Sequence, residues 1–315
     1  MLGRTASDLY WLSRYVERAE NMARLIEVGY RIVLLPREGE GYHEEWRSTL
    51  ESAGCLAGYV EKYGPLQTRN VIDYMLFDAS NRSSVASCLA TARRNGRAQR
   101  TSLTREMWQT LNSAWLEFSG IRPSSVTSNS LPELLDWVRS RSALYRGSLL
   151  NTILRNDTYC FSQLGTFLER ADSTARILDV KYYHLLPSAE MVGSGQDNFQ
   201  WAAILRSVSA HRSYRWVYKD TYKPVNIAQY LLLNSQMPRS LRSSYDELAT
   251  GLNDLAAFYG ARLACHTTVQ STRDVLIESD IQTVFQSGLH EFVQRLIKCN
   301  NKLGLEISNG YNFNS

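Results

Sequence analysis

Apolar residues recur every three or four positions along most of the chain, which is the spacing of one buried face of an α-helix. The clearest stripe predicts a helix over 7–34, with Ser7 or Asp8 placed to cap its start and Pro36 to end it. The members of this stripe are Leu9, Leu12, Val16, Ala19, Ala23, Ile26, Tyr30 and Val33. The chain is therefore expected to begin with one long helix that buries one face.

The same periodicity predicts further helices, and no alternating pattern typical of a strand persists for more than a few residues. The predicted helices cover 43–63, 67–79, 83–95, 98–119, 131–156, 158–185, 198–221, 225–235, 240–277 and 280–303. Clusters of helix-breaking residues predict loops at 36–41, 121–130 and 186–196, and a break in the 240–277 helix at Gly251 or Gly260. The expected fold class is all-α.

The chain also repeats itself at a shift of 152 residues. Nine of the 23 positions from 12 to 34 are identical to the second copy, namely Leu12, Glu17, Arg18, Ala19, Ala23, Arg24, Val28, Tyr30 and Leu34. Weaker matches continue at slightly larger shifts, as for Trp46 with Trp201 and Ser84 with Ser240.

A repeat of this length exceeds the roughly 20–50 residues of a solenoid unit. We therefore expect one helical domain over 1–315, a large bundle built from two internally duplicated halves. The halves would cover about 1–150 and 151–315, pack about a pseudo-two-fold axis and share one core.

Composition excludes several classes of protein. The 35 basic and 31 acidic residues leave a net charge of +4, too small to favour nucleic acid as a partner. No stretch approaches ~18 apolar residues, so no membrane-spanning helix is expected. Charged residues are spread from Arg4 to Glu20, which does not fit a secretory signal. Five widely spaced cysteines indicate reduced thiols, and the expected location is cytoplasmic.

Metal and nucleotide motifs are missing from the sequence. The one Glu-x-x-His spacing, Glu40 to His43, falls in a glycine-rich stretch, so no metal site is expected. There is no P-loop, G-x-G-x-x-G or G-x-S-x-G motif, and we expect no cofactor to be bound by this chain alone.

The repeated charges carry the chemical information. Glu17-Arg18 recurs as Glu169-Arg170, Glu20 as Asp172 and Arg24 as Arg176. Two interpretations remain open. The set is either a solvated helix face with ion pairs worth about 0.2–0.5 kcal/mol each, or the lining of a polar pocket between the long helices, where arginines hold a carboxylate or phosphate.

Four ordered stretches resemble the signatures of the bacterial Alpha-E family, an all-helical group named for its Glu-Arg motif. The first resembling stretch is 2–26, the second 93–112, the third 164–183, and the fourth begins at Trp201 and continues to Ser240. Asn234 and Arg82 depart from the residues common in the family, aspartate and proline. The resemblance implies an association with a circularly permuted ATP-grasp ligase, and hence a role in amide-bond formation on peptides or small metabolites.

The leading hypothesis is a partner subunit of such a ligase, which would supply ATP and Mg²⁺ and activate a carboxylate as an acyl phosphate. Glu17 and Glu169 are the candidate catalytic proton acceptors. The candidate substrate-binding residues are Arg18, Arg24, Arg170, Arg176, Glu20 and Asp172, followed by Arg97, Arg100, Arg206 and Arg239 from the resembling stretches. The alternative is a non-catalytic helical scaffold that docks a partner enzyme or a peptide.

Overall fold

The computed structural model describes residues 1–33, 42–184, 195–219 and 222–313, and these ranges contain helices and no strand. The fold is therefore all-α, as predicted. The helices of the first half are α1 (Gly3–Val33), α2 (Tyr42–Ser52), α3 (Leu56–Tyr63), α4 (Thr68–Leu76), α5 (Val85–Ala98), α6 (Arg105–Ser119), the 3₁₀ turn η1 (Pro123–Ser125) and α7 (Leu131–Thr152). Those of the second half are α8 (Asp157–His184), α9 (Gly195–Ser207), α10 (His211–Tyr218), α11 (Pro224–Leu232), α12 (Leu241–Tyr259), α13 (Ala264–Glu278), α14 (Ile281–Ser287) and α15 (Leu289–Gly310).

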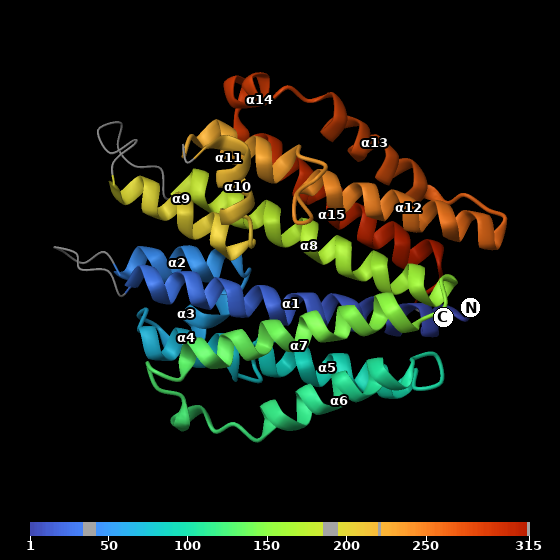
Figure 1. Ribbon diagram of the computed structural model, residues 1–315, viewed down its shortest axis with the longest axis horizontal. Coiled ribbons are helices and arrows are strands. Elements are labelled where there is room, and N and C mark those ends of the chain that lie inside the picture. Colours follow the sequence, from blue (N-terminus) through green and yellow to red (C-terminus); the bar gives the residue numbers. More distant parts are fainter. Residues whose placement is uncertain (34–41, 185–194, 220–221, 314–315) are drawn as a thin grey trace.

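The two longest helices, α1 and α8, lie side by side at the centre of the molecule (Figure 1). Helices α5 and α7 pack on α1, and α12 and α15 pack on α8 in the same way. Two short helices each contact the long helix of the opposite half: α2 contacts α8, and α9 contacts α1. A duplication about a two-fold axis would give the two halves matching helix orders and matching helix contacts, as seen here. The duplication itself stays a prediction.

The predicted apolar stripe of α1 forms the middle of the core. Leu9, Leu12, Ala19, Ala23 and Ile26 are fully buried, and they belong to one continuous apolar cluster that includes residues of both halves. The long helices approach so closely that a Cβ atom at Gly165 would lie 2.1 Å from the main-chain oxygen of Tyr10. Only glycine fits at that crossing.

Several predicted helices are broken at residues with positive φ. The 43–63 helix breaks at Gly54 (φ 67°), the 198–221 helix at Ser209 (φ 57°) and the 280–303 helix at Gly288 (φ 106°). The 240–277 helix breaks at Gly260, one of its two predicted positions, where the left-handed conformation ends α12. Ser209 carries no sequence signal, because serine rarely adopts this conformation. The predicted loops at 36–41 and 186–196 fall largely outside the described residues.

Candidate functional site

Glu17 lies on α1 at the interface with α8 and is fully buried. Arg170 of α8 reaches both of its carboxylate oxygens, with Nε–Oε1 and Nη2–Oε2 distances of 3.1 Å. Arg239 donates to Oε1 at 2.8 Å, and Arg146 of α7 donates to Oε2 at 3.2 Å. Three guanidinium groups therefore surround one carboxylate, each in a charge-assisted hydrogen bond.

Glu169 is bound in a corresponding way, but here the acid lies on α8 and its arginines lie on α1. It is 5% exposed on α8, and Arg18 of α1 binds its two oxygens at 2.5 and 2.9 Å. Arg14 adds a bond of 2.8 Å to Oε2. The Glu-Arg pair of each long helix is therefore completed by the pair of the other, Glu17 with Arg170 and Glu169 with Arg18.

A second layer of acids lies one turn further along each helix. Glu20 is fully buried and accepts hydrogen bonds from Arg24 at 2.6 and 2.9 Å, from Arg239 at 2.6 Å and from Arg146. Asp172 is less enclosed and accepts a bond of 2.7 Å from Arg176. These buried pairs do not form a solvated helix face, so the first interpretation of the repeated charges is wrong for Glu17, Glu20 and Glu169.

We call these three neighbouring groups of ion pairs, around Glu17 and Glu20, around Glu169 and at Asp172, the Glu-Arg network. Its members are Arg14, Glu17, Arg18, Glu20, Arg24, Arg146, Glu169, Arg170, Asp172, Arg176 and Arg239. Seven guanidinium groups share four carboxylates, so the network carries three more positive than negative charges, although each guanidinium group bonds at least one acid. Charge enclosed in this way is costly unless an anion compensates it.

The carboxylates of Glu17 and Glu169 are poor proton acceptors. Burial raises the pKa of Glu17, but the charges of Arg170 and Arg239 outweigh burial and hold that pKa far below the ordinary carboxyl range. Burial likewise acts on Glu169, and Arg18 and Arg14 lower its pKa to about 2. A carboxylate with a low pKa is a weak base and makes an inefficient proton acceptor near neutral pH. The geometry therefore favours a positioning role for both glutamates. Their role as catalytic proton acceptors stays a prediction.

A polar cavity of about 230 Å³ opens beside Glu169 and Asp172, between α1, α8, the α2–α3 turn and the residues that precede α5. Its lining comprises Arg18, Asn21, Met22, Leu25, Ser52, Ala53, Gly54, Ser83, Glu169, Asp172, Ser173 and Arg176. Two polar atoms of these residues, Asn21 Nδ2 and Asp172 Oδ1, are buried without a hydrogen-bond partner among the described residues. An unmet buried polar atom costs about 1–3 kcal/mol, which a ligand can recover by bonding to it.

The structure brings together most, but not all, of the predicted site residues. Arg239 joins the network, whereas Arg97, Arg100 and Arg206 are exposed and lie outside it. Arg100 lies over the Trp108 ring, with 5.5 Å from its Cζ to the ring centroid. The expectation that these three arginines share the polar cavity is corrected, because belonging to a resembling stretch does not fix the direction of a side chain.

Sequence reasoning missed two members of the network. Arg14 lies one helical turn before Arg18 and therefore projects from the same face of α1. That spacing was available in the sequence as a signal. Arg146 comes from α7, more than a hundred residues away from its two acids, and no local pattern identifies it.

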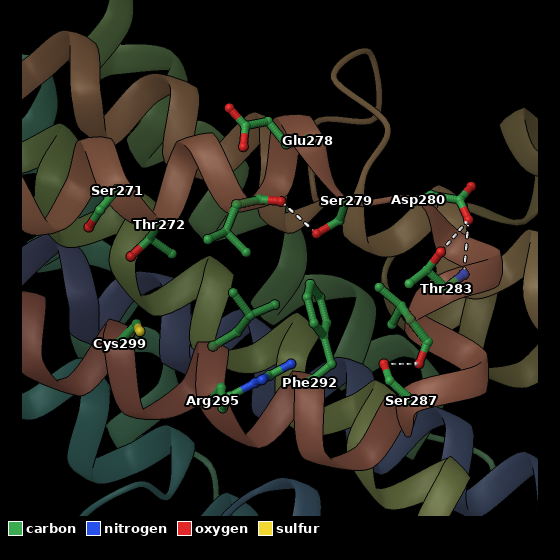
Figure 2. A pocket seen from close by; sticks show the side chains of 13 residues that line it. Ser271, Thr272, Glu278, Ser279, Asp280, Thr283, Ser287, Phe292, Arg295 and Cys299 are labelled. Carbon is green, nitrogen blue, oxygen red and sulfur yellow. Dashed lines mark hydrogen bonds between the residues drawn. The ribbon is translucent and has the colours of Figure 1, made fainter.

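A larger cavity, about 610 Å³, lies elsewhere, between α13, α14 and α15. Figure 2 shows Phe292 and Arg295 projecting into it from α15, with the Arg295 Cζ 5.7 Å from the Phe292 ring centroid. Asp280 at its rim caps α14 by accepting a 2.9 Å bond from the Thr283 amide. This cavity has no bonded link to the Glu-Arg network among the described residues, and its Asp280 carboxylate serves the local fold.

The described part of the chain brings no three histidine, cysteine or acidic residues into a group able to hold a metal ion. Within the same ranges, every helix is too short or too polar to span a lipid bilayer.

Comparison with known proteins gives one match. The model of the Alpha-E family, described as a predicted alpha-helical domain with a conserved ER motif, matches residues 1–311. No curated protein and no solved structure is detectably similar to the chain. The ER motif of that description corresponds in residue type to the Glu17-Arg18 and Glu169-Arg170 pairs at the centre of the network. Because the match covers nearly the whole length, the chain belongs to the Alpha-E family.

Proposed function

We propose that this chain is the substrate-binding partner of a circularly permuted ATP-grasp ligase, and that it binds a carboxylate or its acyl phosphate in the cavity beside Glu169. The observation that supports this proposal best is the charge of the network, in which seven guanidinium groups share four carboxylates. A bound anion would compensate part of this excess, and the cavity gives it access to Arg18 and Arg176.

In this proposal the glutamates position the arginines. Glu169 holds Arg18 by its Nε and one terminal amino group, which leaves the other terminal group for a ligand. Asp172 holds Arg176 by Nε, so both terminal amino groups of Arg176 remain unbonded among the described residues. Donors fixed in advance bind a developing or existing negative charge without the cost of reorganisation.

The ligase would supply the activation chemistry. ATP and Mg²⁺ belong to the partner, which transfers a phosphoryl group to the substrate carboxylate. An amine then attacks the carbonyl carbon of the acyl phosphate, the C–N bond forms, the C–O bond to phosphate breaks, and the amine loses a proton. Closure of the cavity by the docked ligase would protect the acyl phosphate from water. The departing phosphate accepts this proton, so the step needs no basic side chain of the chain.

The test reconstitutes the chain with an ATP-grasp ligase from the same genome, MgATP and a mixture of amino acids. ADP release and the mass of the amide product are measured. The informative variant is Ser83→Arg, which places a long cationic side chain in the cavity. Ser128→Arg is the matched control, because it adds the same charge at an exposed position.

We expect Ser83→Arg to reduce amide formation at least tenfold and Ser128→Arg to leave it unchanged. If both variants support full amide formation, the cavity is not used and the chain acts as a non-catalytic scaffold for the ligase.

A further inference from the structure

The two halves of the molecule differ at three pairs of corresponding positions around the cavity. With the shifts of 155 and 156 residues that align Trp46 with Trp201 and Ser84 with Ser240, Ser83 corresponds to Arg239 and Gly54 to Ser209. With the shift of 152, Asp172 corresponds to Glu20. Ser83, Gly54 and Asp172 all line the cavity, and each is smaller than its counterpart.

The larger counterparts fill the corresponding space in the other half. Arg239 is 8% exposed and donates to Glu17, Glu20 and Asn21 at 2.8, 2.6 and 3.3 Å. Ser209 accepts a bond of 2.5 Å from Arg24. The cavity beside Asp172 is therefore the place where one half lacks the guanidinium group that the other half has.

The difference between the two halves indicates that the ligand carries a cationic group. In the filled half, the carboxylate of Glu20 accepts a bond from the Arg239 guanidinium. In the open half, the corresponding acid is Asp172, whose Oδ1 is buried without a partner among the described residues. A cationic donor of the ligand, such as a primary ammonium group, would take the place of the absent guanidinium and satisfy this oxygen.

The other free groups of the cavity are donors. Asn21 is 6% exposed, and its Nδ2 has no partner within the described ranges. Arg176 offers two terminal amino groups and Arg18 one, because their other donors are bound to Asp172 and Glu169. These groups suit a carboxylate. The ligand therefore needs an ammonium and a carboxylate close together.

We propose that this cavity binds the zwitterionic head of an α-amino acid, with the ammonium on Asp172 Oδ1 and the carboxylate on Arg18, Arg176 and Asn21. The proposal rests on the proposed function and names its substrate class. The cavity volume of about 230 Å³ restricts the occupant to a small amino acid, because pockets for drug-sized ligands measure roughly 300–1,000 Å³. By the same comparison of the two halves, we expect the described residues to form one such site rather than two.

Isothermal titration calorimetry on the full chain tests the proposal with four probes: L-alanine, N-acetyl-L-alanine, ethylamine and propionate. Alanine carries both charged groups, whereas each of the other probes lacks one of them. We expect one molecule of alanine to bind per chain, and the three other probes to bind at least tenfold more weakly. Ser83→Arg should abolish binding of alanine, and Ser128→Arg should not alter it.

A second variant keeps the test decisive if Ser83→Arg does not fold, which circular dichroism will show. Asp172→Asn retains the shape of the side chain and removes the charge that faces the ammonium. It should weaken alanine binding at least tenfold and change propionate binding less than twofold.

The outcomes separate this proposal from the proposed function. If N-acetyl-L-alanine or propionate binds as tightly as alanine, the cavity is a simple anion site, so the amino-acid assignment is wrong and the proposed function stands. If ethylamine matches alanine, the site recognises an amine alone and both are wrong. If none of the four probes binds, or alanine binding survives in both Ser83→Arg and Asp172→Asn, the amino-acid assignment is also wrong.

Discussion

Three guanidinium groups converge on the side chain of Glu17, so its removal should affect stability strongly. Glu17→Ala leaves Arg146, Arg170 and Arg239 buried with less compensation. Breaking a buried ion pair by removing one partner costs about 3–5 kcal/mol. We expect the free energy of unfolding, measured by urea denaturation, to fall by about that amount.

The control for this variant is Asp136→Ala. Asp136 pairs with Arg139 on α7 but is 65% exposed, and exposed ion pairs contribute roughly 0–1 kcal/mol. An equal effect of the two substitutions would contradict the structural role given to Glu17.

Glu169 makes the stability depend on pH in the acid range. Burial alone would raise the pKa of Glu169, but Arg18 and Arg14 lower it from 4.5 to about 2 in the folded protein. A lowered pKa stabilises the folded state above the unfolded-state pKa, and this contribution is lost as the pH falls from about 4.5 to about 2. The free energy of unfolding should therefore decrease over this window.

Glu169→Gln separates this contribution from that of the other acids. The variant has no carboxyl group to titrate at this position, so it should lose less stability over the same pH window than the unmodified chain does. Parallel curves for the two proteins would show that the surrounding arginines do not depress the pKa of Glu169.

At the residue scale, the sequence predicted the identity of the Glu-Arg pairs but not their bonding. Repetition of Glu17-Arg18 as Glu169-Arg170 indicated a constrained role, yet a repeat does not say that each acid pairs with the arginine of the other copy. The exposed positions of Arg97, Arg100 and Arg206 could not be predicted either, because exposure depends on which helices pack beside them.

At the scale of helices, the site depends on how closely α1 and α8 approach each other. Gly165 lies at their crossing, where an added Cβ atom would be 2.1 Å from the Tyr10 oxygen. Gly165→Ala should separate the two helices and lower the free energy of unfolding by about 1–3 kcal/mol, the usual cost of overpacking a core. Chemical denaturation measures the change.

Gly147→Ala is the matched control. Gly147 lies within α7, and a Cβ atom there would meet nothing within 4 Å. Alanine stabilises a helix interior by about 0.5–1 kcal/mol relative to glycine, so this variant should be slightly more stable. Destabilisation of similar size in both variants would mean that the α1–α8 crossing is not unusually close.

The helices themselves were predictable because apolar periodicity reflects burial, and the stripe of α1 is buried as expected. Their interruptions were only partly predictable. Glycine marked the breaks at Gly54, Gly260 and Gly288, but glycine also occurs within helices, as at Gly251. The break at Ser209 depends on tertiary contacts, including its bond with Arg24.

At the scale of the whole molecule, the central helices α1 and α8 belong to different halves and share one core. The repeat in the sequence predicted this arrangement, and the matching helix order agrees with it. The open cavity was not predictable, because it arises where Ser83 and Gly54 replace larger counterparts whose positions only the fold brings together.

The proposed function requires an anion on Arg18 and Arg176 in the cavity between α1 and α8. Anomalous diffraction from crystals soaked in selenate tests it most directly, because selenium is located without reference to the model of the site. We expect a selenium peak within hydrogen-bonding distance of both arginines, and no peak there in crystals of Ser83→Arg. An empty cavity in the unmodified protein, or the same peak in the variant, would contradict it.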